Sequence, residues 1–511
     1  MAIDPHAPCI IGVARHTWRP GDVGPAGAPE PLDQWEQVAR DAASDVGMPG
    51  VLSSLESIQV VNCLSWQYDD PVMRLADRLQ ARPRHRVYTG LGGTVPQVIV
   101  ADAAREILNG HLDLSLVVGG EALATLRRYR RDNQKPTWSH PPKERPPFPS
   151  DLVFHPAEIT HSIYEAFLTF AIFDNARRSA IGRGLIEHRE TLGETLSKLT
   201  KCAASSPQHA WFPTSRTVQE IITPTPENRM VAYPYTKLMV AIMDVDMAAA
   251  LVVSSHQKAD QLGVPIDQRV YLNGYGYAQD PDHVAERRDL SKSLAMAAAS
   301  ERAFRSAQIG VDDVAHFDLY SCFASSLAFA TDALGISDHA DRRSLTVTGG
   351  LPYHGGPGNN YMTHSIAAMV EKLRSDPDSY GLVSGVGMHM AKHAYGIWST
   401  NPPDVSLLRE ALDASSQHAS SQPPQSQLPQ ASPLPITSTY KGDATVAAYS
   451  VLHGRDGSAQ WGAVVCDLPD GSRCYSRLEH PDDLERAERE EIVGSAARLT
   501  PDENGVNRAK L

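Results

Sequence analysis

Short apolar runs alternate with amphipathic stretches along the first 400 residues of the chain. Residues 58–64 and 114–122 are almost wholly apolar, which indicates buried strands. Between them, residues 96–110 carry apolar side chains at helical spacing, and Gly110 marks the end of the predicted helix. The alternation of such strands and helices predicts a layered α/β fold with a mainly parallel sheet.

The order strand, glycine turn, helix, strand occurs twice in the chain. The first copy has the turn TGLGG (89–93), the helix 96–110 and a strand that starts at 114. In the second copy, the predicted strand 344–350 is followed by a helix (361–374) and a strand (380–387). The recurrence favours a duplicated α/β unit, with halves over residues 1–260 and 261–405, although an unduplicated α/β protein can show such pairs too.

Two further segments differ in composition from these halves. Residues 127–151 are basic and rich in proline, which predicts a surface loop, and helices are expected over 163–182 and on to about 207. Residues 406–436 are rich in Ser, Gln and Pro, which is typical of a linker. Residues 437–511 follow it.

Residues 437–511 have the pattern of a small β-rich module. Strands are predicted at 444–454, 459–468 and 472–478, and an acidic helix at 482–491. This pattern predicts a five-stranded β-barrel of the OB type.

Charge and cysteine content narrow the classes of function. The 511 residues carry a net charge of −13, which argues against nucleic-acid and anionic-membrane partners. No apolar run is long enough to span a bilayer, the N-terminus does not resemble a signal peptide, and the six cysteines form no CxxC pair. We therefore expect a cytoplasmic protein. The final Ala509-Lys510-Leu511 loosely resembles a peroxisomal address, but three residues match easily by chance.

Several longer motifs point to a known family. They are NRMVAYPYTKLMVAIMDVDMAAALVVSS (228–255), VVGGEALATLRR (117–128), HFDLYSCFASS (316–326), GGLPYHGGPGNN (349–360) and MHMAKHAYGIWST (388–400). Over residues 8–400 the chain resembles the acetyl-CoA acetyltransferase branch of the thiolase superfamily. The resemblance implies a duplicated, five-layered αβαβα fold, and the C-terminal module resembles an OB-like domain appended to some thiolase-like proteins.

The resemblance also implies a ligand and an assembly. Family members act on acyl-CoA thioesters without a permanently bound cofactor and are generally homodimers. The insert and the extra domain could obstruct the dimer contact here, so both a dimer and a monomer stay open.

The residues that carry thiolase chemistry in the family are replaced in this chain. By alignment, the nucleophilic cysteine corresponds to Gly92, one histidine to Tyr320 and the other to Gly356. The second cysteine falls near Ser384 or Gly385. Because no thiolate can form at the turn, ordinary thiolysis is not expected.

Gly92, Gly356 and Tyr320 could still act on a thioester. Backbone amides of the turn at Gly92-Gly93, at a helix N-terminus, and near Gly356 could hold a carbonyl oxygen or an enolate, or the glycines could merely allow tight packing. Tyr320 could donate a hydrogen bond to an oxyanion or act as a base, or it could simply anchor its loop.

The glycine run 355–358 is preceded by Tyr353 and His354. His354 lies two residues from Gly356 and could partly replace the missing imidazole, or it could be a turn residue that faces solvent. Tyr353 is a second candidate proton carrier. Cys322 is expected to be a core residue rather than a nucleophile.

Other polar residues are weaker candidates. His389 and His393 are four apart on a predicted strand and loop, where this spacing does not favour a metal site. Glu121 and Asn359 complete the candidate set. Four arginines, Arg127, Arg128, Arg130 and Arg131, could meet the phosphates of CoA or could belong to a solvated loop.

Three functions follow from these residues. The first is a thiolase-like protein that binds CoA or acyl-CoA and has altered or lost acyltransferase chemistry. The second is a retro-aldolase that cleaves β-hydroxyacyl-CoA with tyrosines as proton carriers. The third is a scaffold without catalysis, whose barrel recruits a partner.

Overall fold

The computed structural model describes residues 3–24, 27–144, 154–336, 343–415 and 432–511. One nine-stranded sheet holds the first 400 residues together, in the order β3-β2-β4-β7-β1-β8-β11-β10-β9. Its strands are β1 (Pro8–Thr17), β2 (Ser57–Val60), β3 (His85–Tyr88), β4 (Leu114–Ala122), β7 (Asp246–Ser255), β8 (Val270–Gln279), β9 (Val314–Asp318), β10 (Tyr380–Gly387) and β11 (Lys392–Ser399).

The sheet consists of two runs with mirrored pairing. In the first run, β2 pairs parallel with β4, β4 antiparallel with β7, and β7 antiparallel with β1. In the second, β9 pairs parallel with β10, β10 antiparallel with β11, and β11 antiparallel with β8. The runs meet at a short contact between β1 and β8. This symmetry confirms the predicted duplicated α/β fold. The prediction of a mainly parallel sheet is wrong, because five of the eight neighbouring strand pairs in the described sheet are antiparallel and only β3–β2, β2–β4 and β10–β9 are parallel.

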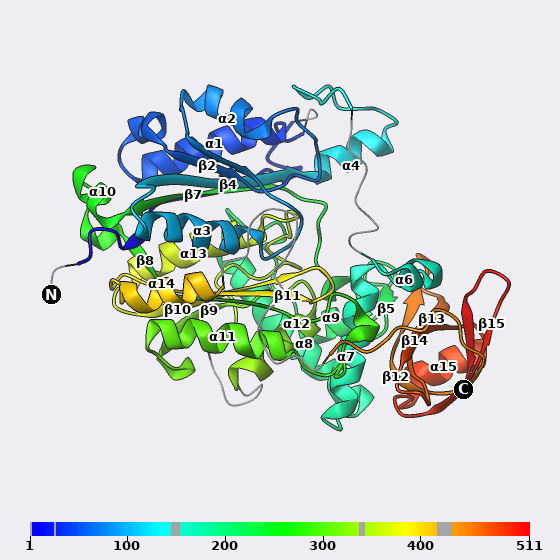
Figure 1. Cartoon of the computed structure of the whole chain (residues 1–511). Coiled ribbons are helices and arrows are strands. Elements are labelled where there is room, and N and C mark those ends of the chain that lie inside the picture. The colour runs from blue at the N-terminus through cyan, green and yellow to red at the C-terminus, as the bar shows by residue number, and fades with distance from the viewer. Residues whose placement is uncertain (1–2, 25–26, 145–153, 337–342, 416–431) are drawn as a thin grey trace.

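Helices complete the layers, as Figure 1 shows. The outer face of the first run carries α1 (Pro31–Asp45) and α2 (Pro71–Leu79), and the second carries α11 (Leu294–Ala307) and α12 (Ala324–Leu334). Between the runs lie α3 (Val95–Leu108) and α13 (Tyr361–Ser375). A Cβ on Gly276 of β8 would lie 1.9 Å from the carbonyl oxygen of Ala299, so this glycine lets α11 lie directly on the sheet.

The predicted strand 344–350 is not a strand in the structure. The Thr346 hydroxyl and the N–H groups of Val347 and Thr348 donate to the carboxylate of Asp318, at 2.8, 3.0 and 3.1 Å. These amides therefore serve a buried carboxylate instead of a neighbouring strand, and the second run has no counterpart of β3.

The region between β4 and β7 forms a helical layer beside the core. Its elements are α4 (Leu123–Arg131), α6 (Pro156–His161), α7 (Ala166–Ala180), α8 (Leu185–Ser205), α9 (Val218–Ile222) and the short strands β5 (Met230–Ala232) and β6 (Tyr235–Thr236). The predicted loop 127–151 is wrong at its start, because residues 127–131 are the end of α4. Residues 145–153 lie outside the described residues.

Some of the predicted linker is also helical. Residues Val405–Ala414 form α14, which buries Leu408, Ala411 and Leu412 and packs against α3, α11 and β8. These apolar side chains at helical spacing have a core to join, so the chain does not leave the body at residue 406. Residues 416–431 lie outside the described part of the chain. The remaining elements are α10 (His256–Gln261) and the 3-10 turns η1 (Pro49–Ser54), η2 (Lys237–Met239), η3 (Ile266–Gln268), η4 (Val284–Glu286) and η5 (Val311–Asp313).

The C-terminal residues form the predicted barrel. Its elements are β12 (Gly442–His453), β13 (Ala459–Asp467), β14 (Arg473–Leu478), α15 (Pro481–Arg489), β15 (Ala496–Pro501) and β16 (Asn507–Lys510). The strands close in the order β12-β13-β14-β16-β15-β12, with the β14–β16 pair parallel and the other pairs antiparallel. This closed five-stranded barrel is OB-like, as the sequence pattern predicts.

The barrel lies against the helical layer that contains α6 and α7 (Figure 1). Hydrogen bonds and a shared core join it to the body. The Tyr233 N–H donates to the carbonyl oxygen of Val451 on β12, and the Asn175 amide donates to the carbonyl oxygens of Tyr233 and Tyr449. Outward-facing residues of β13 and β14, including Val465 and Tyr475, are fully buried in the core of the body. Among the described helices, none is both long and apolar enough to cross a membrane.

Candidate active site

The glycine turn before α3 is held by the loop before α13. Gly92 has φ +140°, a conformation that favours glycine. Its N–H donates to Asn359 Oδ1 at 2.8 Å, and Asn359 Nδ2 donates in turn to the carbonyl oxygen of Asn62 at 3.0 Å. Asn359 is therefore a positioning residue that links the starts of the two central helices.

Tyr320 places its hydroxyl directly against this turn. A Cβ on Gly93 would lie 2.3 Å from Tyr320 Oη and 2.3 Å from the carbonyl oxygen of Val386, so glycine is required there. The Tyr320 backbone is fixed on both sides, since its N–H donates to Ser384 Oγ (3.0 Å) and its carbonyl accepts from Ser326 Oγ (2.7 Å). Among the described residues, none hydrogen-bonds to the hydroxyl itself.

The surroundings keep this phenol protonated. Burial raises the pKa of Tyr320 far above its usual value, so the group is a neutral hydrogen-bond donor at physiological pH. Its ring meets the ring of Tyr361 edge-on at 5.4 Å between centroids. The Tyr361 hydroxyl in turn hydrogen-bonds to Asp318 Oδ1 (2.9 Å) and Thr348 Oγ1 (2.7 Å). Tyr320 therefore suits hydrogen-bond or proton donation better than proton abstraction.

The predicted amide donors at Gly92 and Gly356 already have acceptors. The Gly92 amide is bound by Asn359, and the Gly356 N–H donates to the carbonyl oxygen of Ile242 at 2.9 Å. A substrate oxygen would have to displace these bonds. The amides of Gly93 and Thr94, at the start of α3, have no acceptor among the described residues. Within the predicted glycine turn, they are better placed to receive an oxygen than the amide of Gly92.

His354 lies near Tyr320 but does not reach it. The ring of Tyr361 contacts both, at 5.4 Å from Tyr320 and 6.0 Å from His354 between centroids. His354 is fully buried and its Nε2 lies 3.5 Å from His364 Nδ1. Burial and the nearby His364 lower its pKa well below the usual value, so the imidazole is neutral. The expectation of a turn histidine that faces solvent is wrong.

Tyr353 is buried beside His354, but its surroundings differ from those of Tyr320. Its hydroxyl has no hydrogen-bond partner among the described residues, and burial raises its pKa well above the usual value. The charge that acts against this shift is Arg216, from the segment before α9. Its backbone pairs with Gly350 and Phe212 and not with the glycine turn before α3.

The cysteines near the turn are not activated. Burial raises the pKa of Cys322 to about 12, and its Sγ lies 3.6 Å from Ser326 Oγ. Burial and the Glu121 carboxylate raise the pKa of Cys63 well above the usual value. At Gly385, a Cβ would lie 2.1 Å from the sulfur of Met362, so a thioether fills the place of the family's second cysteine. The site has no thiolate to offer.

Glu121 holds the loops around the site. Its carboxylate accepts from the N–H groups of Leu64 (2.7 Å) and Ser65 (2.9 Å). A Cβ on Gly358 would lie 2.5 Å from Glu121 Oε1, so the same carboxylate packs under the glycine run before α13. Burial raises its pKa, yet each oxygen is already engaged by the backbone, which makes Glu121 a positioning residue.

His389 and His393 each have a different structural partner. His389 Nδ1 lies 2.8 Å from Thr169 Oγ1, and His393 Nε2 lies 3.1 Å from Asp280 Oδ2. The spacing of four therefore does not bring the two imidazoles to one ligand.

The four candidate arginines lie at the end of α4 and differ in their partners. Arg127 forms an ion pair with Asp244, and Arg131 Nε lies 3.1 Å from Asp132 Oδ1. Arg128 packs against Gly27. Arg130 is exposed and has no ion pair with a described residue. The segment that carries Asp244 also supplies Ile242, the acceptor for Gly356. The end of α4 and the glycine run therefore both contact this segment.

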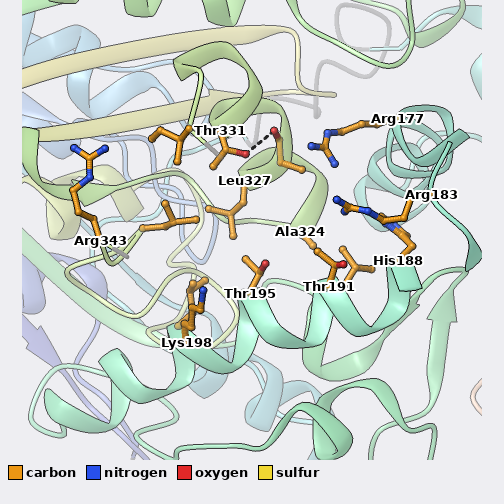
Figure 2. Close-up of a pocket in the computed structure, with 15 residues that line it drawn as sticks. Arg177, Arg183, His188, Thr191, Thr195, Lys198, Ala324, Leu327, Thr331 and Arg343 are labelled. Carbon is orange, nitrogen blue, oxygen red and sulfur yellow. Dashed lines mark hydrogen bonds between the residues drawn. The ribbon is translucent and has the colours of Figure 1, made fainter. Parts of the chain in front are cut away.

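A small hollow of about 50 Å³, partly open to solvent, lies between α8, α12 and the end of α7. Figure 2 shows Arg343 at one end, Arg177, Arg183 and His188 at the other, and Lys198 along α8. Several of these groups have acidic partners: Arg177 Nε lies 2.6 Å from Asp332, and His188 3.0 Å from Asp174. The hollow is therefore less cationic than its lining indicates.

Sequence reasoning missed the network behind Tyr320. Asp318 and Tyr361 were not among the candidates, although they pack behind the tyrosine. One signal was present: Thr346 and Thr348 are polar at alternate positions of a predicted buried strand. Such a pattern indicates a buried acceptor on one face.

The comparisons with known proteins agree with this fold. No family model matches the chain. An acetyl-CoA acetyltransferase from Methanocaldococcus jannaschii is 30% identical over 132 residues, which are 26% of this chain and 32% of that protein. The match thus spans about a third of that relative's length.

Two solved structures cover more of the chain. A monomeric SCP2-thiolase like protein type 1 from Mycobacterium smegmatis is 30% identical, covers all of both chains and has a TM-score of 0.81. The Ltp2-ChsH2(DUF35) aldolase is 14% identical with a TM-score of 0.58, over 77% of this chain and 98% of that chain, which is a likeness of fold. The chain belongs to the thiolase superfamily, among its SCP2-thiolase-like members.

Proposed function

We propose that this protein binds an acyl-CoA thioester without forming a covalent acyl-enzyme. The observation that supports it is the Tyr320 hydroxyl, which lies against the Gly93 turn and has no hydrogen-bond partner among the described residues. The thioester carbonyl would accept from this hydroxyl and from the free amides at the start of α3. The absence of an activated thiol among Cys63 and Cys322 argues against thiolysis.

The CoA phosphates would bind at the end of α4. Arg130 supplies a guanidinium that no described acidic residue neutralises, whereas Arg131 already pairs with Asp132. We expect Arg130→Ala to weaken CoA binding more than Arg131→Ala, which is the matched control on the same helix. Equal CoA affinities in the two variants would show that the CoA phosphates bind elsewhere.

Isothermal titration calorimetry with acetyl-CoA and with free CoA tests the binding proposal. We expect tighter binding of the thioester than of the free thiol, because only the thioester has a carbonyl for Tyr320. If neither ligand binds at millimolar concentration, the proposal is wrong.

A second candidate is a carbon–carbon lyase that acts on β-hydroxyacyl-CoA. The neutral Tyr320 favours it, because a phenol with a raised pKa can deliver a proton to the enolate that cleavage leaves. The likeness in fold to an aldolase is consistent with it. Incubation with a tertiary β-hydroxyacyl-CoA should release a ketone, and Tyr320→Phe should slow that release. Unchanged turnover in Tyr320→Phe would remove this tyrosine from the reaction.

A recruiting role for the barrel has less support. In OB barrels the second and third strands form the ligand-binding face. Here the outward side chains of those strands, including Ala463, Val465 and Tyr475, are buried against the body. Deletion of residues 437–511 would expose this core, so point variants on the open side of the barrel are the better test of a partner.

The assembly state is also a proposal. The relative that is 30% identical over its whole length is described as monomeric. We expect this chain to be a monomer as well, and light scattering after size exclusion should give the mass of one chain. A mass of two chains would favour the family's usual dimer.

A further inference from the structure

Two cysteines face each other inside the barrel. Cys466 on β13 is the direct cross-strand partner of Cys474 on β14, in a ladder without register shifts. Both residues are fully buried, and both belong to the barrel's inner core, together with Val464 and Leu478. The two side chains therefore project into the same interior from adjacent strands.

The backbone separation of this pair suits a disulfide. At the end of the same hairpin, the Leu468 N–H donates to the carbonyl oxygen of Ser472 at 3.0 Å. Hydrogen-bonded and non-hydrogen-bonded pairs alternate along an antiparallel ladder, so Cys466 and Cys474, two positions further on, form a hydrogen-bonded pair. Such pairs have Cα atoms about 5.5 Å apart, within the range found for disulfides. Their Cβ atoms are about 5 Å apart, wider than the roughly 3.8 Å of an unstrained disulfide, so closure must draw the strands together and gives an easily reduced bond.

The pair stands apart from the other cysteines. Cys466 Sγ lies 3.4 Å from Ser476 Oγ, two residues beyond Cys474 on the same strand. None of the other four cysteines has a cysteine opposite it in the sheets.

We propose that Cys466 and Cys474 form a redox-active pair that closes a reversible disulfide across β13 and β14. The oxidant is a small-molecule disulfide such as oxidised glutathione. A thiolate attacks it and releases one reduced glutathione, and the second cysteine then displaces the other glutathione as the S–S bond forms. The protein loses two electrons and two protons, and the oxidant gains them as two thiols.

The pair lies next to the contacts that dock the barrel. Arg473 donates to the carbonyl oxygens of Arg287 and Arg288, and the Tyr475 hydroxyl donates to Glu158 Oε1 at 2.6 Å. These two residues flank Cys474 in the chain. Because both thiols are buried, oxidation requires local opening of this strand pair. The extent of oxidation therefore reports how firmly the barrel is docked.

Trypsin separates the two cysteines, which gives a direct test. Cleavage after Arg455, Arg473 and Arg477 places Cys466 in peptide 456–473 and Cys474 in peptide 474–477. The folded full-length protein is incubated in oxidised glutathione, the remaining thiols are alkylated, and the digest is analysed by mass spectrometry. We expect the two peptides to be linked, about 2 Da lighter than their sum, and to separate on reduction.

Two variants and one control make the result decisive. The linked product should disappear in Cys474→Ser and persist in Cys202→Ser, which removes a half-buried thiol that has no cross-strand cysteine. Protein refolded from denaturant in the same buffer shows that the linked peptides can be detected. Absence of the link in the folded protein, or a link that joins other cysteines, would overturn the proposal.

Discussion

Replacing Gly93 by alanine tests the geometry of the site. The added Cβ would lie 2.3 Å from both Tyr320 Oη and the Val386 carbonyl oxygen. The carbonyl belongs to β10, where Val386 pairs with His393 of β11, and the tyrosine ring is packed edge-on against Tyr361, so neither can move freely. Overpacking of this kind costs about 1–3 kcal/mol of unfolding free energy.

The sign of the change in unfolding free energy distinguishes a crowded Gly93 from an unstrained one. Gly93 precedes α3, and an unstrained Gly→Ala change would stabilise the protein by about 0.4–1 kcal/mol. Gly90→Ala is the matched control, because a Cβ there meets nothing within 4 Å and Gly90 does not have a positive φ. It should stay within about 0.5 kcal/mol of the parent.

Urea unfolding followed by circular dichroism measures both variants. We expect a lower midpoint for Gly93→Ala and an unchanged one for Gly90→Ala. If Gly93→Ala is as stable as the parent or more stable, Tyr320 does not lie against the turn and the reasoning fails.

Three further predictions concern the barrel, pH and covalent chemistry. Tyr475→Phe removes the hydroxyl that serves buried Glu158 and should cost about 1–3 kcal/mol in urea unfolding, whereas Tyr440→Phe, whose hydroxyl has only a 3.4 Å surface contact, should change little. Burial lowers the pKa of His389 to about 4, so the neutral imidazole stabilises the fold fully above about pH 6.5 and this stability is lost as the pH falls. At pH 5 the parent should lose about 2 kcal/mol of unfolding free energy that His389→Gln does not lose. Equal losses in urea titrations of the two proteins would contradict this. With the pKa of Cys322 at about 12, incubation with acetyl-CoA should leave the intact mass unchanged, and a gain of about 42 Da would reveal an acyl-enzyme.

Local sequence patterns predicted the helices and strands well where their apolar residues are buried in the core. The strands 114–122 and 380–387 and the helix beginning at 361 are found at those positions, because continuous burial leaves one arrangement for their apolar residues. The failures have different causes. The segment 344–350 has strand-like composition, but the Asp318 carboxylate, distant in sequence, takes its amides.

The candidate site was predicted in part. Alignment to family motifs selected Tyr320, and the structure places it against the glycine turn. Alignment could not show that the amides of Gly92 and Gly356 already have acceptors, because these acceptors, Asn359 and Ile242, come from other segments. Nor could it show that Tyr361 separates His354 from Tyr320, since that depends on how α13 packs.

Acyl-CoA affinity in paired tyrosine variants tests the central claim most directly. Tyr320 and Tyr353 are both buried, and neither hydroxyl has a protein partner among the described residues, but only Tyr320 lies at the Gly93 turn. Calorimetry should show acetyl-CoA binding weakened about 2- to 12-fold in Tyr320→Phe, the value of one hydrogen bond, and unchanged in Tyr353→Phe. Equal affinity in the parent and Tyr320→Phe would contradict the account.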